Sequence, residues 1–166
     1  LPRVDAMRID VSPRGKKLLS RALMLGGGIC AVYALIAGDM WLRARSAYQE
    51  GEKYMRWYED PQAKKAELEA ELADHKQQAK KQFDAGDFSE DEYKERIEIL
   101  DFDYEESMKE SSVKYAYIWF QTTVELFAKP ESRWVKLSRE KMLLAKQKWQ
   151  EELKAKNIPF EPYMMD

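Results

Sequence analysis

The strongest constraint on this chain is an apolar run without a single charge, ALMLGGGICAVYALIAG, which occupies residues 22–38. An α-helix rises about 1.5 Å per residue, so about 20 residues cross a hydrocarbon core roughly 30 Å thick. The apolar character extends back to Leu18 and forward to Leu42, which gives the run enough length. We therefore predict one transmembrane helix over residues 18–42, preceded by a basic segment at residues 1–17.

A signal peptide and a buried core helix are the two alternatives to a membrane span. A cleaved signal peptide has the same basic start and apolar middle, and Ala37 or Gly38 could precede a cleavage site. The run is retained in the chain, however, which favours an anchor. A buried core helix would need covering by other apolar segments, but 35% of the residues are charged. So polar a chain has too little apolar surface to surround such a helix, and we favour the membrane.

The predicted span also carries a face of small residues. Small side chains on one face allow another helix to approach closely, which matters because hydrophobicity does not drive helices together inside lipid. Three consecutive glycines, at residues 26–28, are costly in a helix unless close packing or a bend compensates. Membrane helices are also rich in Gly and Ala in general, which is the simpler reading of the pattern. The predicted helix-packing face consists of Gly27, Ala31, Ala34 and Gly38.

Charge is distributed unevenly along the chain, whose net charge is −2. Residues 1–38 hold six basic and two acidic residues, a balance of +4, so residues 39–166 carry −6. An acidic body argues against nucleic-acid binding, which needs a basic face. The basic bias before the span places the N-terminus on the cytoplasmic or matrix side of the membrane.

Beyond the span, the pattern predicts helices in water. The first helix continues to about Tyr58, and the pair at residues 60–61, Asp-Pro, interrupts it. A second helix follows to about residue 85, where Gly86 is a good stop. A third begins at Ser89, with Glu92 completing a capping box. Their apolar stripes predict an antiparallel hairpin within residues 43–129; the stripes are Leu68, Leu72, Ala79 and Phe83, and Tyr93, Ile97, Leu100, Tyr104 and Met108.

The turn of this hairpin resembles a known module. Residues 83–100, FDAGDFSEDEYKERIEIL, are similar to the short helical module called SHOCT, in which a GxxSxxE turn joins two small helices. The resemblance covers about a tenth of the chain, implies a hairpin, and brings no chemistry with it. The matching residues are Gly86, Phe88, Ser89, Glu92, Tyr93 and Leu100.

Aromatic residues concentrate after the hairpin, in residues 113–128, VKYAYIWFQTTVELFA. This segment is either a core part of the hairpin or a contact surface for a larger partner, since aromatic residues are enriched at interfaces. A last helix is expected from Pro130, near its first position, to about Lys156, followed by an extended tail held on a partner. The candidate partner contacts are Tyr115, Tyr117, Trp119, Phe120, Phe127, Trp134 and Trp149.

Motifs for catalysis and ligand binding are missing from the sequence. It contains no GxGxxG, P-loop or GxSxG pattern, no CxxC and no pair of histidines for a metal. Cys30 is interpreted as a small apolar residue of the span, and His75, the one histidine, as a solvated side chain. We therefore expect neither an enzyme nor a protein with a cofactor, a metal or a small-molecule substrate.

These features predict an all-α protein: a single transmembrane helix, then an elongated soluble helical hairpin, then a C-terminal helix with an extended tail in residues 130–166. The architecture favours a non-catalytic accessory subunit of a large membrane complex. By analogy of architecture this is a respiratory-chain complex of the mitochondrial inner membrane, with other subunits and the lipid bilayer as partners. An accessory subunit of ATP synthase and a membrane-tethered assembly factor or scaffold module are the alternatives. The start at Leu1 is expected to reflect either a removed leader, such as an organellar transit peptide, or upstream residues that the sequence lacks.

Overall fold

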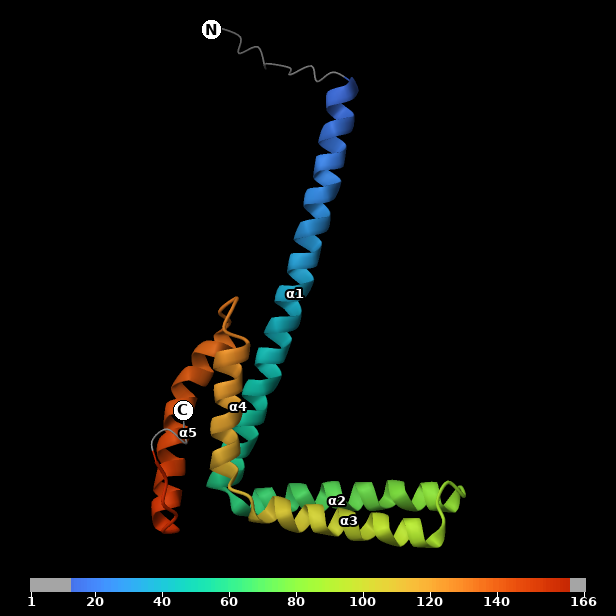
Figure 1. Ribbon diagram of the computed structural model, residues 1–166, viewed down its shortest axis with the longest axis vertical. Helices are drawn as coiled ribbons and strands as arrows, with labels where there is room; N and C mark the ends of the chain where they lie inside the picture. The colour runs from blue at the N-terminus through green and yellow to red at the C-terminus, as the bar shows by residue number, and fades with distance from the viewer. Residues whose placement is uncertain (1–12, 162–166) are drawn as a thin grey trace, which may run out of the picture. The chain divides into compact units, whose positions relative to one another are not determined.

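The structure, a computed structural model, describes the backbone of residues 13–161 and the side chains of Arg21 and residues 23–161. Within these residues the chain is all-α and contains no strand, as the sequence predicts. The part of the chain up to Met40 and the part from Trp41 onward form two separate units. The helices, shown in Figure 1, are α1 (Pro13–Glu59), α2 (Pro61–Asp84), α3 (Glu90–Lys109), α4 (Ser112–Leu126) and α5 (Arg133–Ala155).

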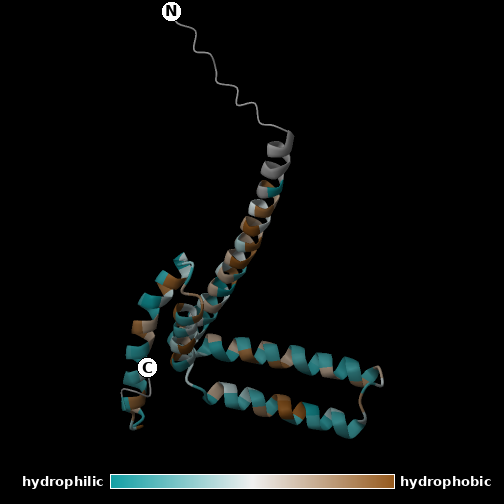
Figure 2. Ribbon diagram, turned by 45° about the horizontal axis from the view of Figure 1, so that its top comes forward, coloured by the Kyte–Doolittle hydropathy of each residue, from teal (hydrophilic) through white to brown (hydrophobic). Residues whose placement is uncertain are grey.

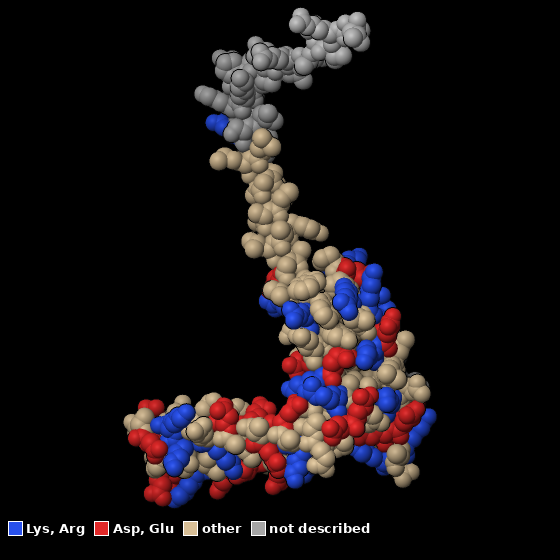
Figure 3. Space-filling view, turned by 180° about the vertical axis from the view of Figure 1, so that it is seen from behind, with Lys and Arg blue, Asp and Glu red and all other residues tan. Residues whose placement is uncertain are grey.

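In the first unit, α1 carries the apolar run. Of the described helices, α1 alone is long and apolar enough to cross a membrane, and none of its apolar window is buried. Leu25 and Leu35, for example, are 71% and 74% exposed. This part of α1 is largely apolar in Figure 2 and forms an uncharged surface in Figure 3. A core helix would be covered by other segments, so the buried-helix alternative does not hold for the described chain. Most of the predicted basic segment at residues 1–17 lies outside the described residues.

The helix continues past the apolar run to Glu59, and α2 begins immediately afterwards. Asp60 is the N-cap of α2: its carboxylate oxygen accepts hydrogen bonds from the backbone N–H groups of Gln62, at 3.0 Å, and Ala63, at 3.2 Å. Pro61 occupies the first helical position, where its missing N–H is of no consequence. The predicted interruption at residues 60–61 is therefore confirmed.

The α2–α3 hairpin turns where the sequence predicts. Gly86 has a φ of +85°, a left-handed conformation that favours glycine, and its N–H donates to the Phe83 carbonyl at 2.9 Å. Ser89 and Glu92 form the predicted capping box: the Ser89 N–H donates to the Glu92 carboxylate at 2.8 Å, and the Glu92 N–H donates to the Ser89 hydroxyl at 3.3 Å. The rings of Phe83 and Tyr93 stack across the turn with centroids 4.8 Å apart.

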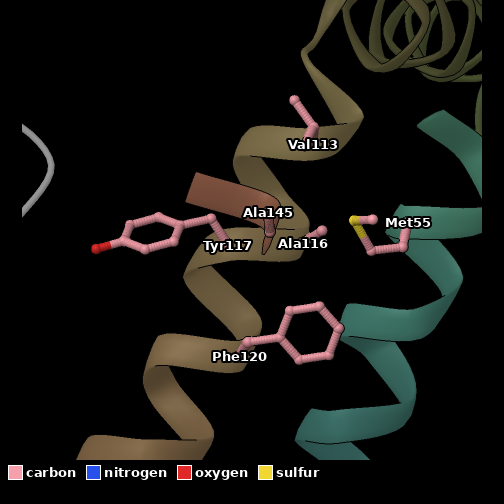
Figure 4. Packing of buried hydrophobic residues seen from close by; sticks show 6 residues of the cluster. All are labelled: Met55, Val113, Ala116, Tyr117, Phe120 and Ala145. Atoms are coloured by element: carbon pink, nitrogen blue, oxygen red, sulfur yellow. The ribbon is translucent and has the colours of Figure 1, made fainter. Parts of the chain in front are cut away.

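The aromatic segment does not belong to the hairpin. The chain breaks at Glu110, and Ser111 caps a separate helix, α4, by accepting a hydrogen bond from the Lys114 N–H at 3.3 Å. Helix α4 packs against α5 and against the second half of α1, so the core of this unit is a three-helix bundle. The expectation of a core segment within the hairpin is therefore wrong. Figure 4 shows the central cluster: Met55, Val113, Ala116, Tyr117, Phe120 and Ala145.

A glycine permits the closest approach in this bundle. Gly51 of α1 is buried, and a Cβ atom added to it would lie 2.5 Å from Cε1 and 2.7 Å from Cδ1 of Phe120. The Phe120 side chain is fully buried, so its ring has little room to move away. Residue 51 must therefore lack a side chain for α4 to pack on α1 in this way.

Helix α5 begins later than the sequence suggests. Ser132, not Pro130, marks its start: the Ser132 hydroxyl accepts a hydrogen bond from the Val135 N–H at 3.4 Å. A serine N-cap accepts a hydrogen bond from a backbone N–H of the first turn that has no partner within the helix, and the proline at residue 130 cannot do this. The prediction that Pro130 lies near the first position of this helix is therefore wrong. At the other end, Asn157 adopts a left-handed φ of 54° and its N–H donates to the Lys154 carbonyl at 3.1 Å. Residues 162–166 of the predicted tail lie outside the described residues.

Candidate functional site

Two of the predicted partner contacts are internal. Phe120 is 0% exposed and Tyr117 is 5% exposed, and both belong to the central cluster between α1, α4 and α5. Trp149 of α5 packs its ring against Tyr117, with centroids 5.7 Å apart. The sequence left open whether this segment forms a core or a partner contact, and Phe120 and Tyr117 belong to a core. That core is the bundle of α1, α4 and α5, which the sequence pattern did not predict.

The other predicted aromatic residues are half-buried, and two of them contact rings of α1. Tyr115 stacks on Tyr54 with centroids 5.3 Å apart. Trp134 lies beside Trp41 and Tyr48, at 6.2 Å and 5.4 Å. Most of the predicted aromatic surface is thus used to hold α4 and α5 on α1. The two half-buried residues for which no ring contact is found in the described chain are Trp119 and Phe127.

A buried lysine joins the two helices of the α2–α3 hairpin. Lys64 of α2 is 7% exposed, and its ammonium group donates to the backbone carbonyls of Met108, at 3.2 Å, and Glu110, at 2.8 Å. These carbonyls lie at the C-terminal end of α3, where helix carbonyls lack partners within the helix. Burial lowers the pKa of Lys64, while the charges of Glu110 and Glu152 oppose that shift. We interpret Lys64 as a structural clamp.

A polar contact between α1 and α5 is also structural. Lys141 lies 3.1 Å from the Glu52 carboxylate, and both side chains are a little over one-third exposed. Burial lowers the pKa of Lys141, but the hydrogen bond and charge of Glu52 outweigh it and the net shift is upward. Beside them, burial raises the pKa of Tyr48, and the charge of Glu52 adds to the effect. Such a pair orients α5 on α1.

No metal-binding arrangement is found among the described residues. No group of three or more His, Cys, Asp or Glu side chains in that part of the chain is placed to hold a metal. His75 lines an open groove between α2 and α3 together with Glu71 and Asp103, but it is exposed and makes no hydrogen bond within the described chain. Cys30 is exposed on the apolar part of α1.

The predicted small-residue face of α1 is open. A Cβ added to Gly27 or Gly38 would meet no atom within 4 Å, and the same holds for Gly26 and Gly28. Nothing in the described chain therefore uses the space that the glycines provide. The other two members of the face, Ala31 and Ala34, are also exposed.

One apolar surface was missed in the sequence, on the outer face of α3. Ile99 is 47% exposed and Phe102 is 62% exposed, on the side of α3 opposite the stripe that packs on α2. Glu95 and Glu98 share this side and have no ion-pair partner within the described residues. Helical spacing would have revealed this face, because positions 99 and 102 are three residues apart and out of phase with the predicted stripe.

Comparison with known proteins identifies no relative. No family model matches the chain, and neither a curated protein nor a solved structure is significantly similar to it. The resemblance of residues 83–100 to SHOCT is therefore confined to the turn sequence. The fold defines a class only: an all-α chain with one helix able to span a membrane and a second unit built from a helical hairpin and a three-helix bundle.

Proposed function

We propose that this protein is a membrane-anchored, non-catalytic accessory subunit of a large membrane complex. The observation that carries the proposal is that no residue of α3, a helix of 20 residues, is buried. Helices in proteins owe most of their stability to the packing of an apolar face. A helix packed only along one side, on a narrow partner helix, gains little of that stability, and a second polypeptide against its outer face would supply the rest.

The composition of the outer face indicates the kind of partner. Helix α3 contains nine acidic and three basic residues, a balance of −6, whereas α2 is balanced. Exposed apolar side chains surrounded by carboxylates fit a partner surface that is apolar at its centre and basic at its rim. Ile99 and Phe102 would form the centre of the contact.

The span offers the second contact in this proposal. Glycine in a helix interior costs about 1 kcal/mol relative to alanine, so three in succession need a compensating interaction. The space beside Gly27 is empty in the described chain. A neighbouring transmembrane helix that approaches this face closely would provide the compensation.

The proposed host is a respiratory-chain complex of the mitochondrial inner membrane, with the N-terminus on the matrix side. This assignment rests on the analogy between single-span, non-catalytic chains of this size and supernumerary subunits. The same architecture suits an ATP synthase accessory subunit. A tethered assembly factor differs from both, because it binds its client transiently.

The test is co-migration of the tagged full-length chain on native gels after mild detergent extraction, followed by mass spectrometry of the band. A permanent subunit co-migrates at a fixed stoichiometry with the mature complex, whereas an assembly factor is found only with partial complexes. The double variant Ile99→Ser/Phe102→Ser should lose the complex, and Leu143→Ser, at an equally exposed leucine of α5, is its control. Migration of the wild-type chain alone would refute the proposal.

The span has a matched pair of variants. Gly27→Leu fills the small-residue face and should weaken incorporation into the complex. Gly26→Leu makes the same change one residue away, on a face rotated by about 100°. Equal incorporation of the two variants would rule out a specific role for the small-residue face.

A further inference from the structure

The end of the three-helix bundle nearest the span can be located from contacts within the second unit. Met55 of α1 clusters with Val113 near the start of α4, whereas Phe120, two turns further along α4, lies against Gly51. Helix α4 therefore runs antiparallel to α1, toward Trp41. Figure 1 shows the α4–α5 turn at the end of the bundle where α1 enters it.

The start of α5 is fixed at the same end. The ring of Trp134 contacts Trp41 and Tyr48 of α1. Trp41 is the penultimate residue of the predicted span, at the depth where tryptophan is enriched at membrane interfaces. The first turn of α5 and the α4–α5 turn that precedes it thus lie at the Trp41 end of the second unit. We call the surface formed by residues 41–45 and 126–134 the membrane-proximal end.

The membrane-proximal end exposes apolar side chains. Leu126 is 65% exposed, Leu42 is 58% exposed and Trp41 is 43% exposed. Apolar groups of this kind in the headgroup region insert toward the acyl chains, as the apolar faces of interfacial helices do. The membrane-proximal end therefore carries an apolar edge that is suited to contact a bilayer surface.

Positive charge surrounds this apolar edge. The guanidinium groups of Arg45 and Arg133 lie over the ring of Trp134, at 5.9 Å and 5.7 Å from its centroid. Stacking on the ring holds both groups beside the interface and leaves their N–H donors available. Lys129, in the turn between the helices, is exposed.

The acidic residues of this region do not cancel that charge. Glu131 is engaged by two cations of α5, Lys136 at 3.8 Å and Arg139 at 3.0 Å. Glu125 accepts a hydrogen bond from Gln121 at 2.8 Å and lies before the turn. Residues 39–166 carry an overall charge of −6, yet the rim of the membrane-proximal end is basic. This pattern is expected for attraction to anionic lipids rather than for solubility alone.

We propose that the membrane-proximal end binds anionic phospholipid headgroups, with Arg45, Lys129 and Arg133 as the cationic contacts and Trp41 and Leu126 inserted beside them. The proposal rests on the membrane anchoring in the proposed function, and it does not depend on membership of a complex. An anionic headgroup is favoured over a protein here because basic and interfacial aromatic residues meet at the depth where headgroups lie.

The experiment compares quenching of tryptophan fluorescence by two brominated lipids. The full-length chain is reconstituted into phosphatidylcholine vesicles containing a minor fraction of either brominated phosphatidylglycerol or brominated phosphatidylcholine. Anionic lipid is expected to quench more strongly at equal mole fraction, and the excess should shrink at high salt. The triple variant Arg45→Gln/Lys129→Gln/Arg133→Gln removes three positive charges. Its quenching by the anionic lipid should fall to the level given by the neutral lipid, because each lost charge lowers the preference for the anionic lipid by about fivefold at low salt.

Two controls separate charge from folding. The variant Arg45→Lys/Arg133→Lys keeps the charge and should keep the preference, whereas the triple variant Lys80→Gln/Lys81→Gln/Lys94→Gln removes equal charge from the hairpin and should also keep it. Equal quenching of the wild-type chain by both lipids, or an unchanged preference in the first triple variant, would overturn the proposal. Absence of quenching by either lipid would instead show that the chain is not anchored, which refutes the proposed function itself.

Discussion

Replacing Gly51 by alanine should destabilise the bundle, although alanine is the better helix former. In an open helical site this substitution stabilises by about 1 kcal/mol. Here the new methyl group would lie 2.5 Å from the Phe120 ring, whereas ordinary contacts are 3.4 Å or more, so the ring or the helix must shift by about 1 Å. Overpacking of a closed core costs about 1–3 kcal/mol, which leaves a net loss on the order of 1 kcal/mol.

The assay is urea unfolding of the full-length chain in detergent micelles, followed by circular dichroism and tryptophan fluorescence. A double-mutant cycle supplies the control. In the Phe120→Ala background the ring atoms Cε1, Cδ1 and Cζ are all absent, so Gly51→Ala should change sign and become neutral or stabilising. An alanine that stabilises the chain while Phe120 is present would refute the close packing of α4 on α1.

Other substitutions and conditions test the hairpin and the bundle separately. Ser89→Ala should lower the free energy of unfolding by about 1 kcal/mol through loss of the α3 cap, as measured by the shift of the urea midpoint. The backbone hydrogen bond from Ser89 lowers the pKa of Glu92. The contribution of the ionised Glu92 carboxylate to the free energy of unfolding is therefore present above its ordinary pKa and is lost as the pH falls through the lowered pKa. Glu92→Gln should make the free energy of unfolding less dependent on acid pH. Burial raises the pKa of Tyr54 above its ordinary value of 10.0. The contribution of the neutral Tyr54 side chain to the free energy of unfolding is therefore full below pH 10 and is lost as the pH rises through the raised pKa. The stability of the Tyr54→Phe variant should be less sensitive to alkali, as followed by tyrosinate absorbance.

Local signals account for the features that the sequence predicted well. Each of these signals determines the structure of only a few neighbouring residues. They are a run without charges, a glycine at a left-handed turn, and a serine three residues before a glutamate. Gly86, Ser89 and Glu92 consequently occupy the roles expected from their spacing. The break at residues 60–61 is local in the same way, because Asp60 caps α2 directly.

Long-range packing accounts for the features that the sequence did not reveal. Nothing near Gly51 in the sequence indicates that Phe120 will lie on it, because the two residues are brought together only when α4 folds back on α1. The aromatic residues of α4 are too numerous for the hairpin alone, and a bundle with α1 and α5 buries them instead. At the start of α5, Pro130 and Ser132 are competing start signals, and the hydrogen bond made by Ser132 decides between them.

The exposed face of α3 shows a second limit of prediction from the sequence. The predicted stripe faces α2, whereas Ile99 and Phe102 lie on the opposite side of α3 and do not follow the period of that stripe. A helix with apolar residues on two faces is expected to have two partners, and one of them, α2, belongs to this chain. We propose a neighbouring subunit as the second.

Cys30, the one cysteine of the chain, permits the most direct test that α1 crosses a bilayer. It is exposed in the chain and lies at the middle of the predicted span. In sealed vesicles it should not react with a membrane-impermeant maleimide until denaturing detergent is added. Ser46→Cys in a Cys30→Ala background, at an exposed position beyond the span, should react without detergent in the molecules whose bundle faces outward. Equal labelling of residues 30 and 46 in intact vesicles would contradict a transmembrane α1.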